Sequence, residues 1–225
     1  MKNKNLFLVV AMVMFGFAAM AQSEGISIGL RVGFNYQNIN GKDMNGDQLK
    51  LDMVPRFNAG VVIEIPVVPA LFFQSGLLYT TKGAKSTNDF PNTNVSAEYS
   101  LSYFELPLNL LLKPALGKGH FLLGFGPYVA YGLDGTAKYT IGNISSDEKI
   151  EFANEYSSLN PYGPYIKRLD YGGNLLLGYE LSGGLSLQLN AQLGMANINA
   201  DNTTYPDNKT SFRNTGFGLS LGYRF

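Results

Sequence analysis

The chain ends in the stretch "TGFGLSLGYRF" (Thr215–Phe225), and this stretch decides the fold. From Phe217 onward every second side chain is apolar or aromatic, and the residues between are small or polar. Successive side chains of a β-strand point to opposite faces, so the pattern predicts a strand with one face suited to lipid and the other to a polar core. The last residue, Phe225, belongs to the apolar face. An ordered, apolar chain end is unusual in a soluble domain and needs a structural reason.

The same alternation recurs upstream. We expect strands over residues 26–36, 57–65, 71–82, 104–113, 121–132, 169–181, 185–195 and 214–225. A tilted strand needs ~9 to 11 residues to cross the hydrocarbon of a membrane, and each of these segments is about that long. Eight is an even number at the small end of the range for outer-membrane barrels. The predicted fold is an all-β, eight-stranded antiparallel up-and-down transmembrane β-barrel.

A few residues depart from the alternation. Leu78, Leu111 and Leu122 fall on the polar face. Pro107 and Pro127 lie inside expected strands, where each removes a backbone donor and predicts a local bulge or an end of pairing.

Short and long connections alternate along the chain. Those at 67–70, 114–119 and 182–184 are short, whereas those at 40–50, 84–96, 133–165 and 200–209 are long and polar. In an up-and-down barrel, odd and even connections lie at opposite ends. The alternation therefore predicts tight periplasmic turns, long extracellular loops and both termini on the periplasmic side.

The start of the chain, "MKNKNLFLVVAMVMFGFAAMAQS", has the pattern of an export signal. Lys2 and Lys4 precede an apolar run over residues 6–17, and Ala19-Met20-Ala21 forms a cleavage motif. The alternative is an uncleaved anchor, but the run is shorter than the ~20 apolar residues that a span needs. We expect a signal peptide over residues 1–21, an outer-membrane barrel domain over residues 22–225, and an exported protein.

Composition excludes several classes of function. Seventeen basic residues balance seventeen acidic ones, so no positive field is available to bind nucleic acid. Cysteine is absent, which rules out disulfides and thiolate chemistry. The single histidine, His120, is expected at the short-turn rim, away from any catalytic partner. The chain carries no nucleophile elbow, phosphate loop or metal-spaced histidines, so we expect no enzyme, cofactor or metal.

A soluble, lipocalin-like ligand carrier is an alternative eight-stranded barrel. Such a carrier places apolar side chains inside and a face rich in lysine and glutamate outside. Here the polar face consists of glycine, serine, asparagine and glutamine with isolated charges, and the middle of the apolar face is almost uncharged. Charge on a lipid face costs ~2 to 4 kcal/mol at the midplane, so this pattern favours the membrane barrel.

Isolated charges on the inward face form the candidate site. They are Arg31, Glu64, Glu105, Lys113, Asp170, Glu180 and Arg224. Buried charges must be paired, so we expect an ion-pair network that fills the lumen. The alternative is a narrow, selective porin-like channel. We favour the filled lumen because side chains fill the interior of eight-stranded barrels.

Two of the long connections carry further candidates. The segment "DMNGDQ" resembles a calcium loop through Asp43, Asn45 and Asp47, but its glycine comes too early and Val54 stands where a bidentate glutamate is needed, so we favour a solvated turn. The connection from Leu133 to Tyr165 mixes tyrosines with charges. It either binds an unknown partner or simply shields the barrel, and the second interpretation is favoured because long outer loops are routine.

The whole mature chain resembles a known family. The pieces "FNAGVVIEIPV", "FFQSGLLYTTKGAK", "YFELPLNLLLK", "GFGPYVAYGL", "DYGGNLLLGYEL" and "GFGLSLGYRF" are similar to outer-membrane β-barrel proteins of Gram-negative bacteria, including PorT-like and porin family proteins. The resemblance is specific for architecture and uninformative about activity. We expect a monomer in outer-membrane lipid, with a structural or interaction role in the cell envelope, accessory to transport or secretion. The resemblance also implies that the outer-membrane insertion machinery recognises the closing strand through Leu219, Leu221, Tyr223 and Phe225.

Overall fold

The computed structural model describes residues 25–90, 93–157, 163–201 and 208–225. The predicted signal peptide, residues 1–21, lies outside the described residues. Within the described part, no helix has the length and apolar character needed to cross a membrane.

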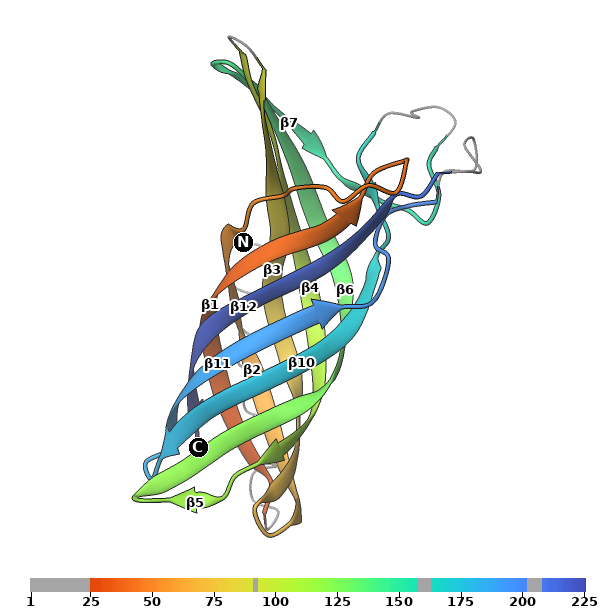
Figure 1. Cartoon of the computed structure of the whole chain (residues 1–225). Helices are drawn as coiled ribbons and strands as arrows, with labels where there is room; N and C mark the ends of the chain where they lie inside the picture. The colour runs from red at the N-terminus through yellow and green to blue at the C-terminus, as the bar shows by residue number, and fades with distance from the viewer. Residues whose placement is uncertain (1–24, 91–92, 158–162, 202–207) are drawn as a thin grey trace, which may run out of the picture.

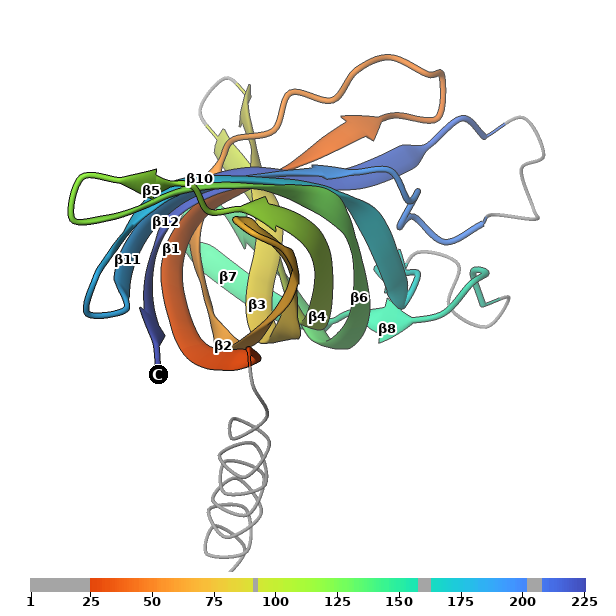
Figure 2. The same cartoon turned by 90° about the horizontal axis from the view of Figure 1, so that it is seen from below.

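Eight long strands form a closed ring in the described part of the chain (Figures 1 and 2). In ring order they are β1 (Ser27–Lys42), β2 (Val54–Val68), β3 (Leu71–Phe90), β4 (Thr93–Leu112), β6 (Gly119–Ile141), β10 (Leu169–Leu181), β11 (Leu185–Gly194) and β12 (Ser211–Arg224). Neighbours pair in antiparallel register around the whole ring. The predicted eight-stranded up-and-down barrel is confirmed.

The closing strand explains the ordered chain end. Strand β12 pairs with β1 from Gly29 opposite Arg224 to Lys42 opposite Ser211. Beyond the ladder, the backbone N–H of Phe225 donates to the carbonyl of Ile28 at 2.9 Å. The terminus is therefore held by the seam that closes the barrel, as the alternation predicts.

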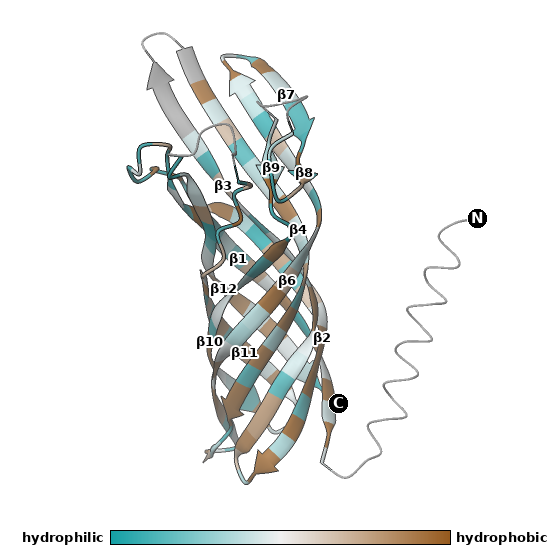
Figure 3. Ribbon diagram, turned by 90° about the vertical axis from the view of Figure 1, so that its right-hand side faces the viewer, coloured by the Kyte–Doolittle hydropathy of each residue, from teal (hydrophilic) through white to brown (hydrophobic). Residues whose placement is uncertain are grey.

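The two faces of the wall separate apolar from polar residues. Outward side chains such as Val32, Phe34, Leu175, Leu189 and Leu219 are exposed. Inward positions are filled by glycine, amides and charged groups, which are largely buried. The wall therefore carries apolar side chains outside, the reverse of a soluble carrier, and Figure 3 shows that hydrophilic residues become more frequent toward the long-loop end.

The prolines leave the register unchanged. The ladder between β3 and β4 skips the pairs around Pro107 and resumes in the same register, and the ladder between β4 and β6 does the same around Pro127. Neither proline produces a bulge; on one side of each proline the pairing is interrupted instead, which is the other outcome expected there. Register shifts occur instead between Pro66 and Val68 and between Ser102 and Tyr103. Pro127 points outward and is exposed, so its ring does not disturb the packed interior.

The leucines on the polar face form a small apolar layer inside the barrel. Leu111, Leu122 and Leu176 pack together and against Phe72. Leu78 is also buried. Their departure from the alternation is therefore real, and it marks positions where the lumen is filled by hydrocarbon instead of polar groups.

The long connections contain more strand than expected. Strands β3, β4 and β6 continue beyond the barrel, and β6 pairs with β7 (Ile144–Lys149) in a projecting hairpin (Figure 1). Two short strands, β8 (Glu151–Phe152) and β9 (Tyr165–Ile166), pair in parallel, and β5 (Ala115–Leu116) lies in a short turn. The interpretation of 84–96 and 133–165 as bare loops is wrong, because these segments pair with one another and bury apolar side chains.

The free-energy cost of a charge on the outward face should depend on the depth of that residue in the membrane. Leu175 lies on β10 midway between Tyr171 and Tyr179, and its side chain is exposed. We expect Leu175→Arg to destabilise the barrel by about 2 to 4 kcal/mol in urea titrations of protein in lipid vesicles. The control is Leu169→Arg at the long-loop end of the same strand, expected to cost about 0 to 1 kcal/mol. Equal costs would argue against this placement of the membrane.

Candidate functional site

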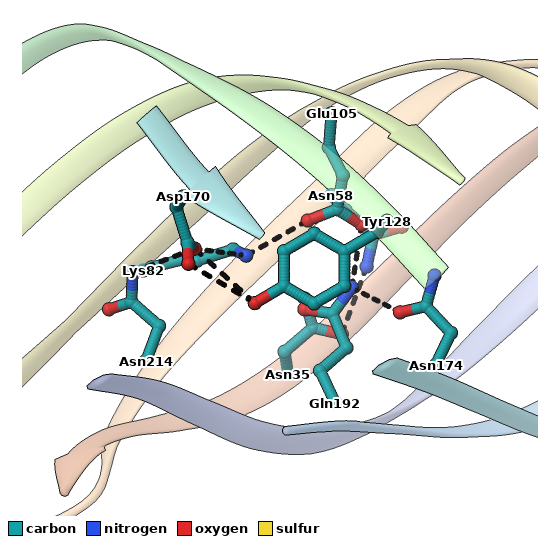
Figure 4. A network of polar contacts seen from close by, with 9 residues as sticks. All are labelled: Asn35, Asn58, Lys82, Glu105, Tyr128, Asp170, Asn174, Gln192 and Asn214. Carbon is teal, nitrogen blue, oxygen red and sulfur yellow. Dashed lines mark hydrogen bonds and ion pairs between the residues drawn. The ribbon is translucent and has the colours of Figure 1, made fainter. Parts of the chain in front are cut away.

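A buried lysine organises the middle of the lumen. The ammonium of Lys82 on β3 lies 2.9 Å from Glu105 Oε2 on β4 and 3.1 Å from Asp170 Oδ2 on β10. All three side chains are buried. The ring of Tyr128 on β6 lies over the ammonium at 4.2 Å, and Figure 4 shows these groups converging across the lumen. Two carboxylates and an aromatic face thus replace the hydration shell of one cation.

Two side-chain amides and a tyrosine hydroxyl donate hydrogen bonds to the two carboxylates. Asn214 Nδ2 donates to Asp170 Oδ2 at 2.9 Å, and the Tyr128 hydroxyl donates to the same oxygen at 3.3 Å. Gln192 Nε2 donates to Glu105 Oε1 at 2.6 Å. Buried carboxylates are tolerated when their oxygens are satisfied in this way. The network therefore joins six strands of the barrel: β3, β4, β6, β10, β11 and β12.

A second network lies near the short-turn rim. Lys113 Nζ donates to Glu64 Oε2 at 2.7 Å and to Glu180 Oε2 at 2.9 Å. Arg224 donates from Nη2 and Nε to Glu180 Oε1 at 2.7 and 3.0 Å. Gln74 Nε2 adds a hydrogen bond to Glu64 at 3.2 Å. Here cations and carboxylates alternate across the lumen, so each charge faces an opposite one.

Arg31 stands apart from both networks. Its Nη2 donates to Asn190 Oδ1 at 2.8 Å, but no carboxylate of the described residues lies within ion-pair distance. Its Nε and Nη1 have no hydrogen-bond partner in the described part of the chain. The guanidinium borders two small polar cavities of about 20 and 30 Å³. A cavity of that size holds one or two waters, which would satisfy these donors.

The structure divides the predicted inward charges into three places. Glu64, Lys113, Glu180 and Arg224 meet near the rim, Glu105 and Asp170 meet in the middle, and Arg31 lies alone between polar amides.

Sequence reasoning missed Lys82, although it places this residue on the polar face of its strand. A count of the inward cations and carboxylates could have indicated Lys82. The predicted set holds three cations (Arg31, Lys113 and Arg224) and four carboxylates (Glu64, Glu105, Asp170 and Glu180), so one carboxylate lacks a counter-charge. Adding Lys82 balances the set.

In the described part of the chain, the lumen is accessible from the short-turn rim. A cavity of about 350 Å³ at the short-turn rim is bordered by Glu64, Lys113 and Arg224, and the smaller cavities continue it toward Glu105. On the other side, Tyr103 and Tyr128 belong to an apolar cluster with Ile150, Ile166 and Ile198. The outer connections thus contribute side chains that cover the network from the long-loop side.

His120 and the calcium-like turn have ordinary environments. His120 borders the rim cavity at the start of β6, where we expect it. Asp43 Oδ1 accepts hydrogen bonds from the backbone N–H groups of Asn45 and Asp47, both at 2.9 Å. This carboxylate caps its own turn, and no group of three or more histidine, aspartate or glutamate side chains gathers to hold a metal among the described residues.

Comparison with known proteins identifies the class. Residues 20–200 match the family model described as "Outer membrane protein beta-barrel domain". The chain belongs to this family of outer-membrane β-barrels. Outer-membrane barrels have short periplasmic turns and long extracellular loops, so we expect the short-turn rim at the periplasmic end and the long-loop rim at the extracellular end.

Two solved structures are similar to this chain. Neisserial surface protein A (NspA) is 12% identical with a TM-score of 0.44, covering 90% of this chain and 100% of its own. The attachment invasion locus protein Ail of Yersinia pestis, in complex with the heparin analogue sucrose octasulfate, is 11% identical with a TM-score of 0.36, covering 89% of this chain and 99% of its own. No curated protein sequence matches the chain.

Removing the central cation should be costly. We expect Lys82→Met to destabilise the barrel by about 3 to 5 kcal/mol, because it leaves Glu105 and Asp170 buried without a counter-charge. Urea titration in vesicles measures the effect, with Lys138→Met on the exposed outer part of β6 as the control expected near zero.

Adding Glu105→Gln to Lys82→Met should recover part of the lost stability, because one buried charge is removed. A double variant no more stable than Lys82→Met would contradict the network as described.

Proposed function

We propose that this protein is a closed outer-membrane barrel with a structural or interaction role in the cell envelope, accessory to transport or secretion, and that it is neither a pore nor an enzyme. The observation that carries the proposal is the fully buried Lys82–Glu105–Asp170 network across the middle of the lumen. A conducting path would have to separate these charges or pass between them. Breaking a buried ion pair leaves uncompensated charge and is strongly unfavourable.

Apolar layers on both sides of the network support the proposal. Toward the periplasmic end, Leu111, Leu122 and Leu176 pack in the lumen. Toward the extracellular end, Leu101, Ile150 and Ile198 belong to a buried cluster. An ion would therefore meet hydrocarbon before and after the charged layer, and such constrictions oppose hydration of the path.

The interaction role is assigned to the outer connections, above all to the segment from Leu133 to Tyr165. Within it, all residues of β7 are exposed, and Ile144 at the hairpin tip is 78% exposed. The base of the segment is anchored by Ile150, whose backbone N–H donates to the Gly135 carbonyl at 2.9 Å. Burial also raises the pKa of the Tyr156 hydroxyl, so this side chain stays neutral. An ordered surface loses little entropy when a partner binds.

The proposal includes two partners in addition to the unknown partner of the outer connections. Outer-membrane lipid contacts the apolar wall, and the insertion machinery recognises the closing strand. Leu219, Leu221, Tyr223 and Phe225 all present exposed side chains on the outward face of that strand. We expect the barrel to act as a monomer.

The closed lumen predicts an absence of conductance. Purified protein in planar lipid bilayers should give no steady single-channel current across the range of voltages that the bilayer tolerates. Discrete openings in the unmodified protein, abolished by Glu105→Ala, would instead establish the narrow channel. A heat-modifiable band on electrophoresis serves as the control that the protein used is folded.

The outer segment can be tested without deleting it. Ile144→Ser should leave the barrel folded and as protease-resistant as the unmodified protein, but weaken any adhesion or secretion phenotype of the intact gene, because Ile144 is exposed at the hairpin tip and lies outside the buried outer cluster. Ile150→Ser should instead expose the segment to protease, since this side chain is 1% exposed in the outer cluster. If neither phenotype responds to Ile144→Ser or to removal of β7, the segment only shields the barrel.

A further inference from the structure

One side of the outer wall carries cations that have no carboxylate partner. Lys42 at the end of β1 and Arg213 on β12 are exposed, and neither forms an ion pair with a described residue. In the β1–β12 register, Lys42 faces Ser211, and Arg213 is two residues further along β12. Such diagonal neighbours on one face have Cα atoms ~7 to 8 Å apart. Two long cationic side chains can therefore converge on a single anion.

These cations lie just outside the aromatic girdle. Tyr36 and Phe217 face one another on the same two strands, with ring centroids 6.0 Å apart. Arg213 follows four residues beyond Phe217 toward the extracellular end. At ~3.3 Å per residue and a tilt of ~35 to 45°, that is about 10 Å above the girdle, at the outer edge of a headgroup layer that is ~5 to 8 Å thick. Long cationic side chains bend toward that interface.

The neighbouring connection adds apolar contact and further positive charge. Met44 and Met53, between β1 and β2, are 51% and 48% exposed. Lys209, before β12, is exposed and donates its backbone N–H to the Met44 carbonyl at 3.2 Å, which ties the two connections together. Lys50 is exposed in the same connection. Among the described residues of these two connections, Asp43 is engaged with its own turn and Asp201 pairs with Lys167, so Asp47 and Asp52 are the remaining carboxylates.

The opposite wall lacks this arrangement. Above the facing aromatic pair Phe104 and Tyr131, the ladder of β4 and β6 pairs Ser102 with Asp134 and Glu98 with Lys138. The carboxylate of Glu98 forms an ion pair with Arg56 of β2 at 3.0 Å. At this height the outward face of the β1–β12 ladder carries two cations and no carboxylate, whereas β4 and β6 carry carboxylates there.

We propose that Lys42 and Arg213, supported by Lys50 and Lys209, form a binding site for the phosphate of a lipid headgroup in the surrounding outer leaflet. A phosphate is the anion whose charge and oxygens match a guanidinium and an ammonium together. The lipid is the chosen source because the site adjoins the girdle and because the exposed methionines beside it suit the boundary between headgroups and acyl chains. The bound lipid would lie against the β1–β12 side of the barrel.

The experiment counts lipids that stay bound. The full-length mature protein is reconstituted in nanodiscs of phosphatidylcholine mixed with phosphatidic acid, whose headgroup is a bare phosphate monoester, and retained lipids are identified by native mass spectrometry. The unmodified protein should retain phosphatidic acid in preference to phosphatidylcholine, and sodium chloride should weaken this preference. Lys42→Gln combined with Arg213→Gln should reduce the preference by about fivefold for each charge removed.

The matched control is Lys138→Gln, an exposed lysine on the opposite wall that faces Glu98. It should retain phosphatidic acid like the unmodified protein, and each variant must show the heat-modifiable band of a folded barrel. An unchanged preference in the double variant, or an equal loss in the control, would overturn the proposal. Displacement of phosphatidic acid by equimolar inorganic phosphate would also overturn it, because the site would then bind the free ion.

Discussion

The structure depends on one constraint: within hydrocarbon, every backbone N–H and C=O group must be paired inside the protein. A sheet satisfies this only when its last strand returns to its first, because an open edge would leave a row of unpaired groups in lipid. The ladder between β12 and β1, extended by the hydrogen bond from Phe225 to Ile28, provides that closure. The chain end is consequently a structural element, and an apolar terminal residue is stable there.

Closure with eight strands leaves a narrow interior, and the narrowness governs the chemistry inside. The facing walls lie close together, so a charge on one strand can reach its counter-charge on another. Lys82 reaches Asp170 across 88 positions of sequence, and Lys113 bridges Glu64 and Glu180. These pairs cost desolvation as well as giving attraction, so they are weak contributors to net stability. Their main structural consequence is that charged side chains fill the lumen.

The sequence predicted the strands, their faces and the barrel closure, because all three follow from a local period of two. It failed where the outcome depends on which strands lie opposite each other. Lys82 stands on the expected face, but its role emerges only when the register places it between Glu105 and Asp170. The sequence pattern predicts loops for the outer parts of β3, β4 and β6, because strands outside the membrane need no lipid face. Pro107 suggested a bulge from its own chemistry, yet its neighbours preserve the register.

Because the lumen is filled, the residues that carry the function are expected on the outer surface. The wall between the girdles is apolar on all sides, so differences between its sides appear only above the girdle, where strand ends and connections begin. There the β4–β6 side extends into a hairpin with a buried base, and the β12–β1 side presents cations that form no ion pair with a described residue. A protein that only needed to close a barrel would require neither feature. The extracellular rim is therefore where selection for activity, as opposed to selection for folding in lipid, is expected to act.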